Sequence, residues 1–319
     1  MLLEPEATCH ARAMTRFALL DTDLELGQAP GRILALMGDM NGKYPSGNSV
    51  LVTGTEESIL IDPSLTVHER GGAPGRVDRM LVSHAHEDHM AGCSRFPDTP
   101  LHAHHDDLLG LHSVEGVLQV YGFAEPWRSE WKKTLVEEFH YVAREDATGF
   151  GDGHRFDLGG TSVEVVHLPG HTRGHSGFLI EPDGVLFVAD IDLTGFGPYY
   201  GDHWSDLEDF ERSIARVGEI DAKHYVTFHH KGVVSNRGEF LEQLGAFQDV
   251  IDQRDVRLLE FLREPKTMDN IVADHFIYRP GSAPVFAEHV ERRSMTMHLA
   301  RQLRLGTVTE IEPELFRAT

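Results

Sequence analysis

Four candidate metal ligands, in two pairs that could each share one ion, lie in the six-residue segment 84–89, which reads HAHEDH. Alternate residues of an extended chain point the same way, so His84 and His86 can share one ion. A turn or the start of a helix would then direct Asp88 and His89 towards a second ion. The alternative is a solvated histidine-rich loop. Burying these groups without a metal would cost on the order of 1–3 kcal/mol for each uncompensated polar group.

Three further candidate ligand positions follow downstream, each next to the end of an apolar run. His171 stands at the tip of a Pro-Gly turn. Asp190 ends an apolar run directly, and for that reason we prefer it to its neighbour Asp192. The last run is followed by His229 and His230, and either imidazole could be the ligand.

This order of strand, histidine or aspartate, and loop resembles the metallo-β-lactamase superfamily. The match consists of HAHEDH at 84–89, PGHT at 169–172, Asp190 and His229, and it covers roughly residues 31–235. The resemblance implies an α+β fold, a four-layer αββα sandwich with the metal ions at one edge between the two sheets.

The resemblance also implies a centre of two metal ions with three ligands each and one shared carboxylate. The implied ligands are His84, His86 and His171 for the first ion, Asp88, His89 and His229 for the second, and Asp190 as the bridge. In the family, one histidine followed by glycine usually ends this series, so His230 stays open as the alternative to His229. We expect His175 to orient a ligand or to be structural, and Asp62 to support the site.

Nitrogen and oxygen ligands suit Zn²⁺ best, and Mn²⁺ and Fe²⁺ are compatible alternatives. Two such ions would activate a bridging water as a hydroxide nucleophile. We therefore expect attack on a carbonyl or phosphoryl centre, with Asp88 and Asp190 as the catalytic carboxylates. Asp190 would bridge the ions, and Asp88 or a metal-bound water would transfer the proton.

The net charge of −22 limits the class of substrate. Such a surface repels phosphate backbones, so a nucleic-acid partner is disfavoured. We expect a small-molecule ester, thioester or lactone first, a phosphodiester or RNA second, and a non-catalytic metal-binding module third. Hydrolysis of β-lactams is not expected, because the related two-metal enzymes usually have a cysteine, or no bridging carboxylate, where this chain has Asp190.

Aromatic residues follow Asp190 closely and predict a substrate pocket. The residues expected to line it are Tyr44, Phe196, Tyr199, Tyr200 and Trp204. The alternative is a loop that packs on its own domain.

The elements that must position these side chains follow from the apolar pattern. Strands are predicted at 33–37, 50–53, 58–61, 77–83, 154–158, 162–167, 178–180, 185–189 and 226–228. Residues 102–148 read as a helical insertion. A further helix is predicted at 205–217, with Ser205 as its N-cap.

The pattern becomes mainly helical from residue 236, with helices predicted at 240–262, 266–276 and 287–303 and a short strand at 307–311. We divide the chain into an N-terminal extension (1–13), a hydrolase domain (14–235) and a C-terminal subdomain (236–319). The last weakly resembles the winged-helix-like extension of some relatives. Because its composition is not basic, we expect a pocket cover or a dimer element, and hence a homodimer.

Cys9 and Cys93 are the two cysteines, and we expect free thiols in a reducing cytosol. Acidic residues stand where a signal peptide needs positive charge. No stretch reaches the roughly 18 apolar residues of a membrane span. We therefore expect a soluble cytoplasmic protein.

Overall fold

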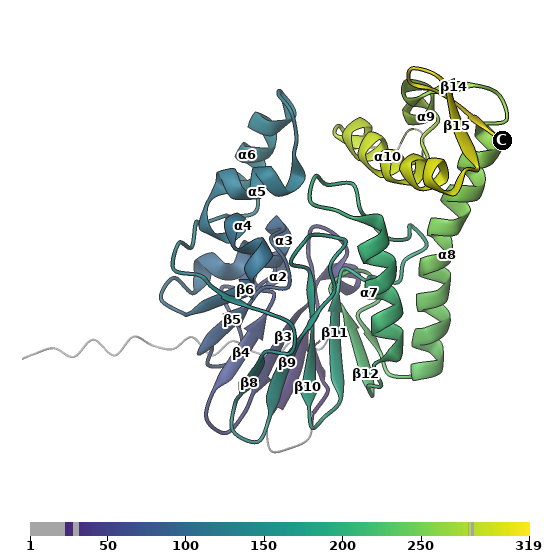
Figure 1. Cartoon of the computed structure of the whole chain (residues 1–319). Helices are drawn as coiled ribbons and strands as arrows, with labels where there is room; N and C mark the ends of the chain where they lie inside the picture. Colours follow the sequence, from purple (N-terminus) through teal and green to yellow (C-terminus); the bar gives the residue numbers. More distant parts are fainter. Residues whose placement is uncertain (1–22, 28–31, 280, 282–283) are drawn as a thin grey trace, which may run out of the picture.

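Two β-sheets pack face to face, and helices cover both outer faces (Figure 1). The computed structural model describes residues 23–27, 32–279, 281 and 284–319. This arrangement confirms the predicted α+β class and the four-layer sandwich. The predicted N-terminal extension, and Cys9 within it, lie outside the described residues.

The first sheet has seven strands in the order β1-β2-β3-β4-β5-β6-β7. Its strands are β1 (Leu24–Glu25), β2 (Arg32–Leu36), β3 (Ser49–Thr53), β4 (Ser58–Ile61), β5 (Arg79–Leu81), β6 (Leu101–His104) and β7 (Thr148–Phe150). Strands β1 to β4 pair antiparallel, as the predicted hairpin at 50–61 requires. From β4 to β7 the pairing is parallel, so the carboxyl ends of these strands share one edge.

The second sheet has six strands in the order β13-β12-β11-β10-β9-β8. Its strands are β8 (Arg155–Asp157), β9 (Ser162–His167), β10 (Ser176–Glu181), β11 (Val185–Ala189), β12 (His224–Thr227) and β13 (Val233–Val234). The pair β11–β12 is parallel, whereas the other pairs are antiparallel.

Helices of the domain lie mainly before β7 and after β11. They are α1 (Asp39–Gly42), α2 (Leu65–Glu69), α3 (Glu87–Met90), α4 (Leu108–His112), α5 (Val114–Tyr121), α6 (Trp127–Glu137) and α7 (Leu207–Glu219), with 3-10 helices η1 (Ala91–Arg95) and η2 (His105–Asp107). Helices α4 to α6 fall inside the predicted insertion and stand on the outer side of the first sheet (Figure 1). Helix α7 packs on the second sheet.

The central strands are apolar along their whole length because both of their faces are buried. In β3, Val52 belongs to the core between the two sheets, whereas Leu51 packs on the helical side. In β11, Phe187 faces the other sheet, whereas Leu186 and Val188 pack towards α7 and the next helix. This two-sided burial fixes the strand ends, from which the loops of the site emerge.

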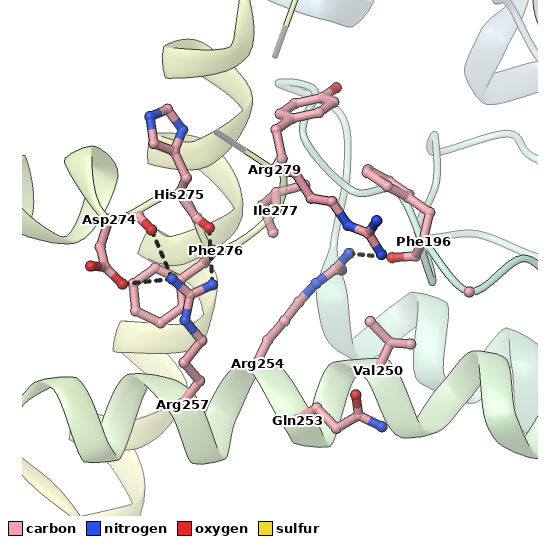
Figure 2. A pocket seen from close by; sticks show the side chains of 12 residues that line it. Phe196, Val250, Gln253, Arg254, Arg257, Asp274, His275, Phe276, Ile277 and Arg279 are labelled. Carbon is pink, nitrogen blue, oxygen red and sulfur yellow. Dashed lines mark hydrogen bonds and ion pairs between the residues drawn. The ribbon is translucent and has the colours of Figure 1, made fainter. Parts of the chain in front are cut away.

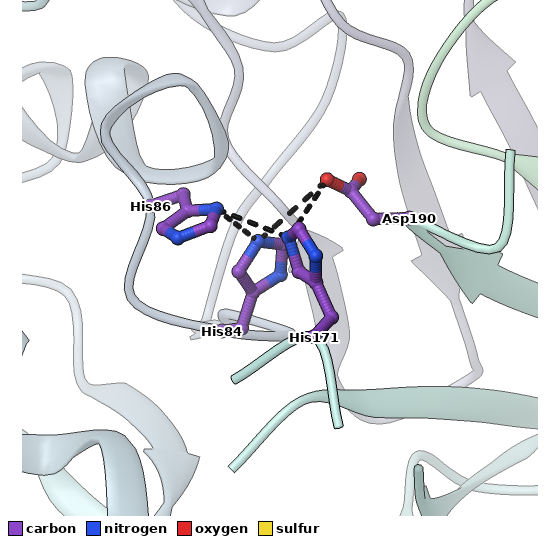
Figure 3. A group of neighbouring side chains, drawn as sticks. All are labelled: His84, His86, His171 and Asp190. Atoms are coloured by element: carbon purple, nitrogen blue, oxygen red, sulfur yellow. Dashed lines mark hydrogen bonds and ion pairs between the residues drawn. The ribbon is translucent and has the colours of Figure 1, made fainter. Parts of the chain in front are cut away.

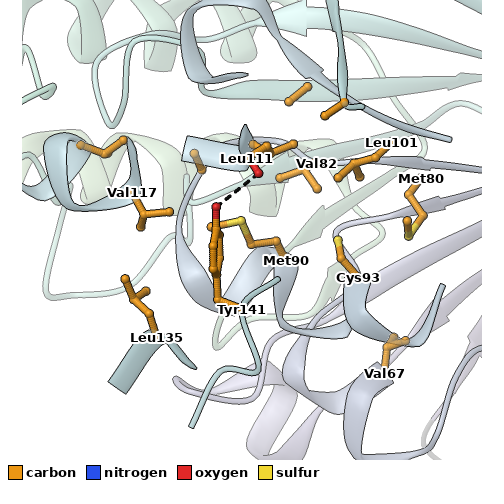
Figure 4. Close-up of a cluster of buried hydrophobic side chains, with 14 of the residues drawn as sticks. Val67, Met80, Val82, Met90, Cys93, Leu101, Leu111, Val117, Leu135 and Tyr141 are labelled. Atoms are coloured by element: carbon orange, nitrogen blue, oxygen red, sulfur yellow. Dashed lines mark hydrogen bonds between the residues drawn. The ribbon is translucent and has the colours of Figure 1, made fainter. Parts of the chain in front are cut away.

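The helical side of the first sheet has its own apolar core (Figure 4). Leu111 of α4 and Val117 of α5 pack there with Met80 and its neighbours in the first sheet. The hydroxyl of Tyr141 donates to the Leu111 carbonyl at 3.2 Å. Cys93 is a buried free thiol in the same cluster.

The C-terminal part combines helices with a small sheet of order β14-β16-β15. Its elements are α8 (Arg237–Phe261), β14 (Lys266–Thr267), α9 (Met268–Ala273), α10 (Ala287–Leu305), β15 (Val308–Glu312) and β16 (Leu315–Ala318). A separate apolar cluster, which includes Leu258, Ile271 and Leu299, holds them together. No helix in the described part of the chain has both the length and the apolar character that crossing a membrane requires.

Local predictions fail in three places. The predicted helical insertion at 102–148 begins with strand β6 and ends at strand β7, and both strands pair within the first sheet. Asp206, rather than Ser205, caps α7, because its carboxylate accepts a hydrogen bond from the Asp209 N–H at 2.9 Å. Ser205 instead donates to the His171 carbonyl at 2.7 Å. Both residue types are good caps, so local preference alone cannot choose between them. The predicted helix at 266–276 begins as strand β14, whose partner β16 lies almost fifty residues downstream and was not predicted.

We predict that α8 is anchored to the domain through Phe240. Its ring stacks on Tyr225 of β12 with centroids 3.7 Å apart, and both side chains are fully buried. Phe240→Ala should lower the free energy of unfolding by about 3–5 kcal/mol, because it leaves a cavity. Leu241→Ala is the matched control, since Leu241 is 39% exposed and its loss should cost about 0.5 kcal/mol or less. Urea unfolding measures both, and equal losses would contradict the prediction.

Candidate metal centre

The candidate ligands meet at one edge of the sandwich, where strands end. They are His84 and His86 in the loop after β5, Asp88 and His89 in α3, His171 after β9, Asp190 after β11 and His229 after β12. Because β11 and β12 are parallel neighbours, their carboxyl ends bring Asp190 and His229 to the same edge.

The first group comprises His84, His86, His171 and Asp190, whose candidate ligand atoms all lie within 4.8 Å of one another (Figure 3). The Nδ1 atom of His86 is 3.0 Å from Nε2 of His84 and 3.1 Å from Nε2 of His171. Nε2 of His171 is 3.2 Å from Oδ2 of Asp190. Four polar atoms therefore converge on one point.

The second group comprises Asp88, His89 and His229. Oδ2 of Asp88 is 3.0 Å from Nε2 of His229. Asp190 connects the two groups, because its Oδ1 lies 3.1 Å from Nε2 of His89 while its Oδ2 faces the first group. The structure thus places Asp190 between the two groups, where a bridging ligand would be needed.

The outer nitrogens of the ligand histidines have partners that fix the ring orientations. Nδ1 of His89 is 2.7 Å from Oδ2 of Asp62, Nδ1 of His171 is 2.8 Å from the Tyr199 carbonyl, and Nδ1 of His229 is 2.7 Å from the Gly42 carbonyl. If Nδ1 carries the proton in each ring, Nε2 is unprotonated and points its lone pair inward, where it can bind a metal ion. Metal-binding histidines are typically held in this way.

Several inward atoms have short contacts but no hydrogen bond. Among the described residues, Oδ2 of Asp88, Nε2 of His89 and Oδ1 of Asp190 are buried and without a hydrogen-bond partner. Leaving such groups unsatisfied costs on the order of 1–3 kcal/mol each. A divalent cation between them would satisfy all three, so the residues present fit a metal centre.

The electrostatics of the centre point the same way. Burial opposes ionisation of Asp190, but the nearby His89 and other histidines hold the pKa of its carboxyl well below the usual range. Burial, followed by the neighbouring His89 and His86, holds the pKa of His84 well below its ordinary value. An ionised carboxylate and a neutral imidazole are the protonation states that metal ligands need.

His89 shows where positive charge is required. Burial lowers its pKa, but the carboxylates of Asp190, Asp88 and Asp62 outweigh burial and raise the pKa well above its usual value. These three carboxylates therefore favour a positive charge at the centre, and a bound cation would supply it in place of the proton on His89.

Asp62 and His175 lie outside both groups and hold members of them in place. Asp62 is fully buried and accepts from the Ser83 N–H and hydroxyl, each at 2.6 Å, while it pairs with His89. His175 donates from Nδ1 to the Leu168 carbonyl at 2.8 Å, and its Nε2 accepts from the Asp190 N–H at 3.2 Å.

Two buried carboxylates beside the centre were not predicted from the sequence. Oδ2 of Asp202 lies 2.8 Å from Nε2 of His86, and its Oδ1 accepts from the Tyr199 hydroxyl at 3.0 Å. Asp202 lies in the long loop after β11 and reaches the centre only through the course of that loop, so no sequence pattern indicates its position. Glu87 lies inside the HAHEDH motif, between the candidate ligands His86 and Asp88, and this position could have indicated that its carboxylate lies beside the centre.

Glu87 lies at the centre of a small tyrosine cluster. Its carboxylate accepts hydrogen bonds from the hydroxyls of Tyr44, at 3.1 Å, and Tyr121. Burial, with the nearby charge of Asp88, raises the pKa of Glu87 to about 7.

The structure does not bring all the predicted pocket residues to the same place. The half-exposed Tyr44 lies near the centre, with its ring centroid 6.2 Å from that of His229. The ring of Tyr199 lies 5.7 Å from that of His171. Phe196 instead lines a separate pocket with residues of α8.

The prediction that Tyr200 and Trp204 line the pocket is wrong, because both side chains are buried in cores. Tyr200 is 1% exposed, and its hydroxyl is bound by His298 at 2.9 Å and by Arg254 at 2.6 Å. Trp204 belongs to the apolar core on the helical side, with the guanidinium of Arg173 over its ring.

The two local competitors for ligand positions also lie outside the groups. Asp192 accepts from the Thr194 N–H at 3.0 Å and hydroxyl at 2.9 Å. His230 has a left-handed φ of 61° and is absent from both groups, whereas His229 is in the second.

A family model described as Metallo-beta-lactamase superfamily matches residues 44–229. Among solved structures, the chain is similar to a metallo-beta-lactamase family protein from Thermus thermophilus, with a TM-score of 0.65 and 21% identity over 95% of this chain and 100% of that one. A beta-lactamase domain protein from Burkholderia ambifaria gives a TM-score of 0.63 and 16% identity, over 92% and 93% of the two chains. At these identities the likeness shows the fold.

The curated relatives are distant. A lactamase-like protein of Pestalotiopsis fici is 26% identical over 184 residues, 54% of this chain and 48% of that protein, so the match spans about half of its length. An acyl-coenzyme A thioesterase of Bos taurus is 24% identical over 200 residues, 56% of this chain and 70% of that protein. A hydroxyacylglutathione hydrolase of Hahella chejuensis is 24% identical over 225 residues, 69% and 73% of the two chains.

The adjacent histidines allow a matched test of the second group. His229→Ala should weaken binding of one metal ion by at least about tenfold to a hundredfold, because it removes an inward nitrogen. His230→Ala should leave metal binding unchanged. Titration against a chromophoric chelator, with circular dichroism to verify folding, measures both. Loss of metal from His230→Ala alone would reverse the assignment.

Proposed function

Because the chain belongs to the metallo-beta-lactamase superfamily, whose members are mostly hydrolases, we propose that it is a metal-dependent hydrolase acting on a small thioester or a related ester or lactone. The observation that carries this proposal is the pair of converging groups with Asp190 between them. Such a site suits hydrolysis better than binding alone, which would not need two groups that share a carboxylate.

Two divalent ions, of which Zn²⁺ fits the nitrogen and oxygen donors best and Mn²⁺ or Fe²⁺ are alternatives, would supply an activated water and stabilise negative charge on the substrate. His84, His86, His171 and Asp190 would hold one ion, and Asp88, His89, His229 and Asp190 the other.

The chain's own residues would orient the reaction. Asp62 keeps the His89 ring turned inward through its contact with Nδ1. Asp88 presents Oδ2, a buried oxygen that could receive a proton from the attacking water. Tyr44 stands half-exposed beside His229, so it would contact the substrate as it enters.

The net charge disfavours a nucleic acid as the substrate, and the names of two relatives favour a thioester. The net charge of −22 opposes the approach of a polyanion, which argues against RNA and for a small molecule. The names of two relatives, an acyl-coenzyme A thioesterase and a hydroxyacylglutathione hydrolase, both describe hydrolysis of a thioester. A phosphodiesterase on the same centre is the second candidate, and the same charge opposes it.

Metal content and substrate preference test the proposal together. Wild type should hold about two metal ions per chain, and His86→Ala should lose metal and activity in parallel. His154→Ala is the control, since His154 is exposed and lies outside both groups. Elemental analysis would be paired with hydrolysis of a lactone, a thioester and a bis-aryl phosphodiester.

The thioester is expected to be the preferred substrate. Preference for the phosphodiester would move the protein to the second candidate function. A folded wild type that holds no metal and cannot be reconstituted would overturn the hydrolase proposal.

A further inference from the structure

A pocket of about 750 Å³ lies outside both ligand groups, between the loop after β11, helix α8 and the segment 274–279 (Figure 2). Phe196 contributes from the loop, Arg254 and Arg257 from α8, and Tyr278 and Arg279 from the segment. The pocket therefore lies between the domain that carries the candidate centre and the C-terminal part.

The charge of this pocket is opposite to that of the whole protein. Three arginines and one aspartate, Asp274, line it, whereas the chain carries a net charge of −22. A local positive surface on an acidic protein concentrates anions. The planar fork of arginine matches phosphate in particular.

Arg254 is held rigidly in the wall of the pocket. It is 5% exposed and donates to the carbonyls of Phe196 and Pro198, each at 2.8 Å, and to the Tyr200 hydroxyl. These neutral partners fix the guanidinium without cancelling its charge. In Figure 2 the side chains of Arg254 and Arg279 both extend towards the loop that carries Phe196.

Arg257 and the aromatic side chains complete the lining. Arg257 pairs with Asp274 at 2.6 Å and lies over the ring of Phe276, 4.2 Å from its centroid. The rings of Phe196 and Tyr278 are tilted against each other with centroids 5.7 Å apart. Aromatic faces next to guanidinium groups suit a ligand that carries both a flat ring system and phosphates.

Tyr199 lies between the candidate centre and the C-terminal apolar cluster that borders the pocket. The carbonyl of Tyr199 accepts from Nδ1 of His171, a candidate ligand. Its side chain packs against the C-terminal apolar cluster, as does that of Tyr278, and this cluster includes the pocket residue Ile277. Tyr199 therefore contacts a candidate ligand on one side and, on the other, the apolar cluster to which the pocket residue Ile277 belongs.

We propose that this pocket binds the phosphate-bearing, nucleotide-like end of a thiol carrier whose acyl thioester is cleaved at the centre. This inference rests on the proposed function. In the reaction, water adds its oxygen to the acyl carbon, the carbon–sulfur bond breaks, and the thiol sulfur takes a proton, so that a carboxylic acid and the free thiol are released. The pocket would act on binding rather than on the bond-breaking step.

The test compares an acyl-coenzyme A with the same acyl group on N-acetylcysteamine, which lacks phosphates. Arg279→Glu should raise KM for the coenzyme A ester by about tenfold with kcat nearly unchanged, because it removes uniform binding. The truncated thioester should not be affected. Arg263→Glu is the matched control, since the Arg263 side chain is 77% exposed, lies outside the pocket and gives the same change in net charge.

Calorimetric titration with adenosine diphosphate separates the pocket from the reaction. If Arg279→Glu weakens the binding of adenosine diphosphate about tenfold and Arg263→Glu does not, the pocket proposal is supported. If neither thioester is hydrolysed in addition, the proposed function is overturned while the pocket remains a binding site. If both thioesters are hydrolysed but Arg279→Glu behaves like Arg263→Glu in kinetics and binding, the pocket proposal is overturned and the proposed function stands.

Discussion

Negative charge buried at the edge of the sandwich is the constraint on which the rest of this structure depends. Asp88 and Asp190 bring carboxylate oxygens to within 3.1 Å of inward imidazole nitrogens without forming hydrogen bonds to them. In a low-dielectric interior such an arrangement is costly unless a cation is present. The surrounding structure is therefore best understood as a frame that holds unsatisfied atoms apart from water and close to one another.

The frame is rigid because its strands are buried on both faces. Leu51 and Val52 pack into different cores, so β3 cannot shift by one residue without moving apolar side chains to the wrong layer. The loops then start from fixed points, and hydrogen bonds such as that from His229 Nδ1 to the Gly42 carbonyl set the ring orientations. Stability and site geometry thus come from the same packing.

The C-terminal part is joined to this frame by buried polar contacts rather than by apolar packing alone. The Tyr200 hydroxyl meets His298, which in turn pairs with Asp255 at 2.7 Å, and Arg254 fixes the loop around Phe196. Buried polar networks of this kind specify one relative position of the parts they join. The contacts that the loop after Asp190 makes with α8 and α10 therefore determine the shape of the space beside the centre.

The sequence by itself determined most strand positions, because apolar runs are local properties. Its motifs also resemble a family, and that resemblance implied the fold class and the side chains that meet at the centre. The sequence supported only a preference for Asp190 over Asp192, from the end of an apolar run, and it left His230 open as the alternative to His229, since neighbours differ only in where the folded chain points them. It also held no indication of Asp202, and it placed Tyr200 in a pocket rather than in a core. Those positions depend on contacts between residues far apart in the chain, which only the tertiary structure brings together.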